Sequence, residues 1–344
     1  VQNLNEASRF FQACRDEAER AKKSLFEFSA AKEARIHLLD VGRTVRQRKE
    51  AAALVDDLSY RIRTQMPHPI AYRWRTIETE KEGLEAYIQI LECAEIILCY
   101  LACLAISISH HQNHQIKYVL EIQKRFSEKP KHGTNMGDWI AILRELRDSK
   151  QFRKLENTYL IPELLQFLKD PLADEAVNNL AKYRNDQSHG RGPKGELNIK
   201  TAFLNSKEDL FKLMNAVEFL TDYPFRFIID TQRDSIRKLT HYKYRDLMGD
   251  HPLTMLHEAD SHSPEIETNS LYFVDRKNNL FLLRPLLNRL QCEECGNWAT
   301  YYLDKFDQKN QVCTLKSMES YESHVIQSSS LNEVLETIGM IGKN

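Results

Sequence analysis

Glycine and proline are scarce in this chain, which has 11 glycines and 10 prolines among 344 residues. Few residues interrupt regular structure, and this favours long helices. An excess of charge of one sign is also lacking, because 48 lysines and arginines nearly balance 49 aspartates and glutamates. Any contact with nucleic acid must therefore come from a local basic patch. Hydrophobic residues make up 42 %, enough for real cores, so a wholly disordered chain is excluded.

The sequence also lacks export and membrane signals. It opens directly into a charged helical pattern, without a secretory leader. The most apolar stretch, 96–106, is too short to span a bilayer, so we expect a buried core helix and no membrane partner. The seven cysteines are an odd number, and four lie among apolar residues, where a reduced thiol is a small hydrophobic group. We therefore expect a cytoplasmic protein. Because the chain starts at Val1, we also expect an upstream domain or regulatory partner.

Residues 1–65 carry apolar side chains seven positions apart. One row is Leu4, Phe11, Ala18 and Leu25, and the second is Ala7, Cys14, Ala21 and Phe28. This repeat predicts a long helix or a coiled coil. An amphipathic helix that packs on its own domain fits the same pattern, and both alternatives stay open.

The remaining chain divides by its periodicity into a helical and a β-rich part. Residues 79–223 have the apolar spacing of a helical bundle, with Asp170-Pro171 as a start signal for one helix. From 224 to 344, short runs rich in β-branched and aromatic residues predict a small β-rich domain. These runs are 225–229, 271–274, 280–283 and 299–303, with a polar loop at 247–270 and a closing helix at about 330–341. The predicted fold class is mainly α, with a long N-terminal helix, a central bundle and a small β-rich end.

The residues richest in chemistry lie at 183–195, where a predicted helix ends in a glycine-rich loop. Arg184, Asn185 and His189 are the candidate catalytic residues. An imidazole titrates near neutral pH and can move a proton, while a guanidinium can hold phosphate oxygens. Three further cations near the helix end, which suit a polyanion, are Lys182, Arg191 and Lys194. An alternative is structural, because a histidine near a helix C-terminus is favourable through the helix dipole alone.

The segment Arg184-Asn185-Asp186-Gln187-Ser188-His189 resembles the HEPN superfamily, whose hallmark is an Arg-x4–6-His motif, often with a polar residue after the arginine. The resemblance covers about 79–223 and implies an HEPN-like bundle. It also implies a homodimeric, metal-independent endoribonuclease in which His189 is general base or acid and Arg184 anchors the phosphate. RNA would be the substrate, in a bacterial defence or toxin-like system. Some relatives only bind RNA, nucleotides or protein partners.

A second motif, Cys292-Glu293-Glu294-Cys295-Gly296, has the spacing of a zinc knuckle. A closed structural site needs two more ligands, for which Cys313 and His324 are the candidates. The alternative is a degenerate zinc ribbon without metal. Catalysis itself requires no cofactor under the ribonuclease hypothesis, so any zinc would be structural.

Three functional hypotheses follow. The first is an HEPN-type ribonuclease. The second is a non-catalytic interaction or RNA-binding module attached to an upstream catalytic domain. The third is a zinc-ribbon scaffold in which the bundle only dimerises. A phosphate-binding loop of the Walker type and a GxSxG nucleophile elbow are both lacking from the sequence.

Overall fold

The computed structural model describes residues 2–24, 57–129, 132–251, 254–292, 296–307, 309–310, 312–320, 326–328 and 336. Contacts divide the chain into two compact units, Val1–Arg61 and Ile62–Asn344. The first unit contains helix α1 (Gln2–Ser24), which agrees with the helix predicted there. Ala7, Cys14 and Ala18 of the predicted apolar rows are half-buried along α1. Leu25 and Phe28 lie outside the described residues, so the coiled coil stays a prediction.

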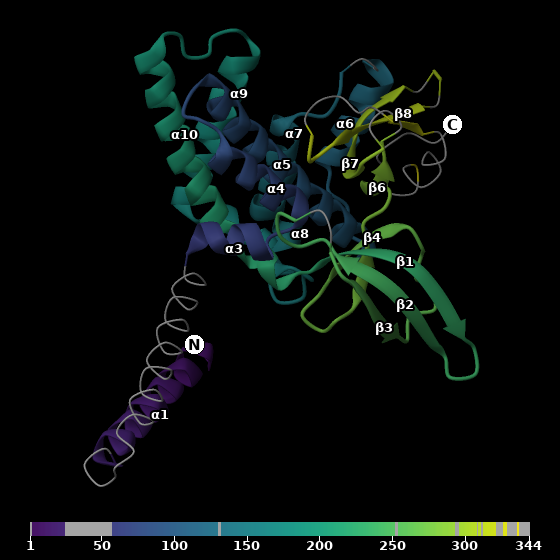
Figure 1. Cartoon of the computed structure of the whole chain (residues 1–344). Coiled ribbons are helices and arrows are strands. Elements are labelled where there is room, and N and C mark those ends of the chain that lie inside the picture. Colours follow the sequence, from purple (N-terminus) through teal and green to yellow (C-terminus); the bar gives the residue numbers. More distant parts are fainter. Residues whose placement is uncertain are drawn as a thin grey trace. The chain divides into compact units, whose positions relative to one another are not determined.

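Helices make up most of the chain from Leu58 to Asp222 (Figure 1). They are α3 (Leu58–Gln65), α4 (His68–Thr79), α5 (Leu84–His111), α6 (Tyr118–Glu128), α7 (Met136–Asp148), α8 (Lys150–Arg153), α9 (Pro171–Ser188) and α10 (Glu196–Ala216), with short 3-10 turns at Pro162–Leu165, Phe167–Lys169 and Glu218–Asp222. Capping residues explain where two of these helices begin. Asn135 and Asp138 form a capping box at α7, and the Asp170 side chain accepts a hydrogen bond from the Leu172 amide at α9.

Helix α5 is the centre of the bundle, and α4, α7, α9 and α10 pack around it. It has 28 residues and is long and apolar enough to cross a membrane. However, 89 % of its most apolar window is buried inside the protein, as expected for a core helix. The predicted core helix at 96–106 is the middle of α5.

Two antiparallel sheets follow the helices. The first has the order β3-β2-β1-β4-β5 and the second the order β6-β7-β8-β9. The strands are β1 (Phe225–Asp234), β2 (Leu239–Asp246), β3 (Leu256–Ser261), β4 (Ser270–Val274), β5 (Leu280–Leu282), β6 (Leu287–Gln291), β7 (Trp298–Asp307), β8 (Val312–Ser317) and β9 (Ile326–Ser328). The structure confirms the predicted order of a helical region followed by a β-rich region, and the β-rich region consists of antiparallel sheets.

The predicted strand runs coincide with parts of β1, β4, β5 and β7. The predicted loop at 247–270 is wrong in part, because it contains β3. That strand is polar and mostly exposed, and it pairs on one edge only, so it has no apolar alternation to reveal it. The predicted closing helix at 330–341 lies outside the described residues apart from Glu336.

Helices and sheets belong to the same compact unit. The Thr134 amide, just before α7, donates to the carbonyl of Asp304 on β7 at 2.7 Å. Trp139 of α7 packs edge-to-face on Tyr302 of β7, with ring centroids 6.1 Å apart. Such contacts place the second sheet against α7, which packs on the central helix α5.

Candidate functional site at the end of α9

Helix α9 ends through a local motif that places His189. The Arg191 amide donates to the carbonyl of Asp186 at 2.8 Å, and the Gly190 amide donates to that of Gln187 at 3.2 Å. This pair of bonds is a Schellman motif. Gly190 has φ +68°, a left-handed conformation that favours glycine. His189 is therefore the C-cap residue, directly after the last residue of α9, and its imidazole lies at an exposed position.

The loop after the motif folds back on the helix. A Cβ at Gly192 would lie 1.9 Å from Oε1 of Gln187, so only glycine fits there without a rearrangement. Arg191 turns its Nε toward Oδ1 of Asp186 at 3.1 Å. The predicted cation Arg191 is thus engaged with a carboxylate of the preceding helix α9.

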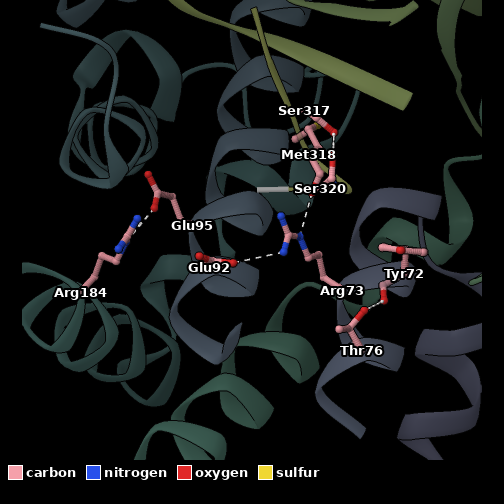
Figure 2. Close-up of polar contacts among 9 residues, drawn as sticks. All are labelled: Tyr72, Arg73, Thr76, Glu92, Glu95, Arg184, Ser317, Met318 and Ser320. Carbon is pink, nitrogen blue, oxygen red and sulfur yellow. Dashed lines mark hydrogen bonds and ion pairs between the residues drawn. The ribbon is translucent and has the colours of Figure 1, made fainter. Parts of the chain in front are cut away.

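Arg184 points from α9 toward α5, where it meets Glu95 (Figure 2). Its Nε donates to Oε2 of Glu95 at 2.9 Å. The Glu95 side chain is 8 % exposed and that of Arg184 is 23 % exposed. A buried carboxylate therefore holds the guanidinium in place and balances much of its charge.

Further charges surround this pair on one side of α5. Glu92, one turn before Glu95, accepts a hydrogen bond from Nη1 of Arg73 at 3.2 Å (Figure 2). Burial raises the pKa of Glu92, and the charges of Arg73 and Arg184 oppose this shift. Burial lowers the pKa of Lys316 on β8, and the charge of Glu95 opposes that shift. Arginines from α4 and α9 and a lysine from the second sheet thus surround two neighbouring acids of α5.

The other predicted residues lie at the surface. Asn185, Lys182 and Lys194 are exposed, as is His189. Arg184 and His189 are five positions apart, about 140° around an ideal helix. Within one chain, the side chains of Arg184 and His189 therefore point in different directions. The three predicted catalytic residues lie along the end of α9 and do not line a closed pocket.

The sequence motifs did not predict Glu95 or Lys316 as neighbours of Arg184. Glu95 lies 89 positions from Arg184, and Lys316 belongs to a different layer. The one available signal was an acidic residue inside an otherwise apolar helix, since a carboxylate on a buried face needs a partner.

The predicted zinc ligands do not assemble as a set. Cys292 lies at the hairpin between β6 and β7, whereas Cys313 pairs with Phe306 near the hairpin between β7 and β8. In a meander these two hairpins lie at opposite ends of the sheet, about 30 Å apart for nine residues of strand. Cys292 and Cys313 therefore do not bind one metal ion together, and the predicted set of four zinc ligands is wrong in this respect. Cys295 and His324 lie outside the described residues.

The described residues contain no cluster of three or more His, Cys, Asp or Glu side chains arranged to hold a metal ion. Burial raises the pKa of the Cys313 thiol to about 12, so this cysteine is a protonated core residue at neutral pH.

Comparison with known proteins assigns the chain to no family. No family model matches the sequence, and no curated protein or solved structure matches it significantly.

Proposed function

We propose that this chain is a metal-independent endoribonuclease of the HEPN type, with RNA as its substrate. The observation that carries the proposal is the exposed His189 at the C-cap of α9, five residues after an arginine that pairs with a buried carboxylate. Exposure supports the proposal because the imidazole must reach a substrate. The anchored Arg184 supports it because a fixed guanidinium loses little freedom when phosphate binds.

The proposed reaction is a transesterification. One imidazole takes the proton of a ribose 2′-OH, whose oxygen attacks the adjacent phosphorus. The bond from phosphorus to the 5′-oxygen breaks, and a second imidazole gives that oxygen a proton. The products are a 2′,3′-cyclic phosphate and a free 5′-hydroxyl. Arg184 would stabilise the charge that develops on the phosphorane oxygens.

The reaction needs two proton-transfer groups, and each chain offers one His189. A homodimer with both helix ends at one cleft would supply the second imidazole. It would also overcome the 140° between Arg184 and His189, because the arginine of one copy can act with the histidine of the other.

The test uses the full chain and total RNA in excess EDTA. The wild type should cleave the RNA and leave 2′,3′-cyclic phosphate ends, and His189→Ala should lose at least about a hundredfold in rate. His110→Ala is the matched control, because His110 is likewise an exposed histidine at the C-terminal end of a helix. Equal cleavage by wild type and His189→Ala would overturn the proposal.

A mixing experiment tests the composite site. Wild-type chains that are unfolded and refolded with an equal amount of His189→Ala chains should lose about half of their activity per wild-type chain, because a mixed dimer keeps only one of the two imidazoles. An unchanged activity per wild-type chain in verified mixed dimers would rule out a shared site.

A second candidate function is a non-catalytic RNA-binding or interaction module. The ion pairs of Arg184 with Glu95 and of Arg191 with Asp186 favour it, because both arginines already have carboxylate partners. This function predicts RNA binding without cleavage and equal affinity in His189→Ala.

A further inference from the structure

Arg289, on β6, is a buried arginine with an unused donor. It is 8 % exposed, and the described residues provide no hydrogen-bond acceptor for its Nη1. Its ion-pair partner is Glu319, with Oε1 3.8 Å from Nη1, which is too long for a hydrogen bond. A buried cationic donor that makes no hydrogen bond is costly, and an acceptor that reached it would remove this cost.

Glu319 is also occupied elsewhere. Its two carboxylate oxygens accept hydrogen bonds from the Thr300 amide, at 3.0 and 2.8 Å. Burial lowers the pKa of Arg289, the charge of Glu319 opposes this shift, and the charge of Arg245 adds to it. The positive charge at this position is therefore only partly compensated.

An exposed aromatic ring lies beside Arg289. The register of β6 and β7 pairs Arg289 with Thr300 and Gln291 with Trp298. Residues paired in this way share a face, so Trp298 is the diagonal neighbour of Arg289. The Trp298 side chain is 51 % exposed, although a tryptophan at the end of a strand is usually covered when it has only a packing role.

The first sheet brings a second arginine to the same place. Phe227 of β1 contacts Trp298, with ring centroids 5.9 Å apart. Arg245 of β2 pairs with Phe227 and lies on the same face of that sheet. The two sheets thus meet at an aromatic contact that has one arginine on each side.

We propose that Arg289, Arg245 and Trp298 form a binding site for a nucleotide unit, with the phosphate held by the two guanidinium groups and the base stacked on the indole. Guanidinium forks match phosphate oxygens, and the face of a tryptophan stacks on any base. A free nucleoside monophosphate and a nucleotide within single-stranded RNA share this chemistry. The site does not include His189, so it does not depend on the proposed cleavage.

Tryptophan fluorescence of the full chain measures binding directly. The chain has three tryptophans, and Trp74 and Trp139 are buried at 1 % and 2 % exposure. A ligand that stacks on Trp298 should therefore quench the accessible part of the signal. AMP should quench saturably, whereas adenosine and inorganic phosphate should each bind at least about tenfold more weakly, since each lacks half of the recognised unit.

Arg289→Met should weaken AMP binding by about tenfold or more, because it removes the buried charge. Arg237→Met is the control, because its side chain is 74 % exposed and lies in the turn between β1 and β2. Thermal melting verifies that both variants fold. If Arg289→Met does not fold, Trp298→Ala is measured by calorimetry, and it should lose about fivefold or more in AMP affinity.

Titration with a single-stranded oligoadenylate distinguishes a free nucleotide from a nucleotide within RNA. The His189→Ala chain is used, so that the oligonucleotide is not cleaved. Tighter binding of the oligomer than of AMP assigns the site to RNA, and binding of AMP alone assigns it to a free nucleotide. The proposal is wrong if neither ligand quenches saturably, or if folded Arg289→Met binds AMP as the wild type does. Loss of cleavage in His189→Ala with unchanged AMP binding separates this site from the proposed active site.

Discussion

The Nε of Arg184 donates to Oε2 of Glu95 across 89 positions of sequence, with the two atoms 2.9 Å apart. This pair joins the helix that carries the candidate motif to the central helix of the bundle. The pair also orients the guanidinium of Arg184 before any substrate binds.

Removal of Glu95 should therefore destabilise the fold. Glu95→Ala leaves Arg184 without its buried carboxylate, and loss of one partner of a buried pair costs about 3–5 kcal/mol. We expect the lower end, because Arg184 keeps 23 % of its side chain exposed. Urea unfolding followed by circular dichroism measures the change. Glu85→Ala, at the exposed start of α5, should cost no more than about 1 kcal/mol. A similar loss in both variants would contradict a stabilising role for the pair.

Gly190→Ala should lower stability through the backbone alone. No atom lies within 4 Å of the added Cβ, but the residue has φ +68°. An L-residue in this conformation costs about 1–2 kcal/mol. Gly83→Ala is the matched control, because Gly83 is an N-cap in extended backbone with φ 171° and has room for a methyl group. Equal unfolding midpoints of Gly190→Ala and the wild type would show that the end of α9 relaxes easily.

Stability should fall between about pH 10 and pH 12 in part because of Tyr87. Burial raises the pKa of Tyr87 to about 12, and the charges of Tyr183 and Asp186 add to the shift. The unfolded side chain ionises near pH 10, so the unfolded state binds fewer protons in this window. The contribution is complete below pH 10 and is lost as the pH rises, at about 1.4 kcal/mol per pH unit.

Tyr87→Phe should remove this part of the slope in urea unfolding at a series of alkaline pH values. Tyr72→Phe, on α4, controls for the loss of a phenol hydroxyl. An unchanged slope in Tyr87→Phe would mean that this side chain ionises equally in both states.

Trp139→Ala should weaken the helices and the second sheet together. The Trp139 side chain is 2 % exposed and packs on Tyr302, so its truncation should cost about 3–5 kcal/mol. Because helices and sheets form one compact unit, far-ultraviolet and near-ultraviolet signals should shift to lower urea concentration together. Leu197→Ala, a position that is 77 % exposed, should shift neither signal noticeably. Two separate transitions would mean that the sheets unfold on their own.

Much of the local structure could be predicted from the sequence, since its signals are short-range. Asp170 and Pro171 start α9, and Gly190 ends it, because capping and left-handed backbone depend on neighbouring residues. The apolar run of α5 likewise indicated a core helix. Strand β3 was missed because an exposed edge strand needs no apolar alternation.

The sequence by itself determined where α9 begins and ends, and that a histidine stands at its exposed end. Only the tertiary structure decided that Arg184 meets Glu95, that Cys292 and Cys313 lie apart, and that Arg289 lies beside Trp298. The reason is physical. Caps and periodicity act over a few residues of chain, whereas ion pairs, metal sites and binding surfaces depend on distances in space that packing of separate elements sets.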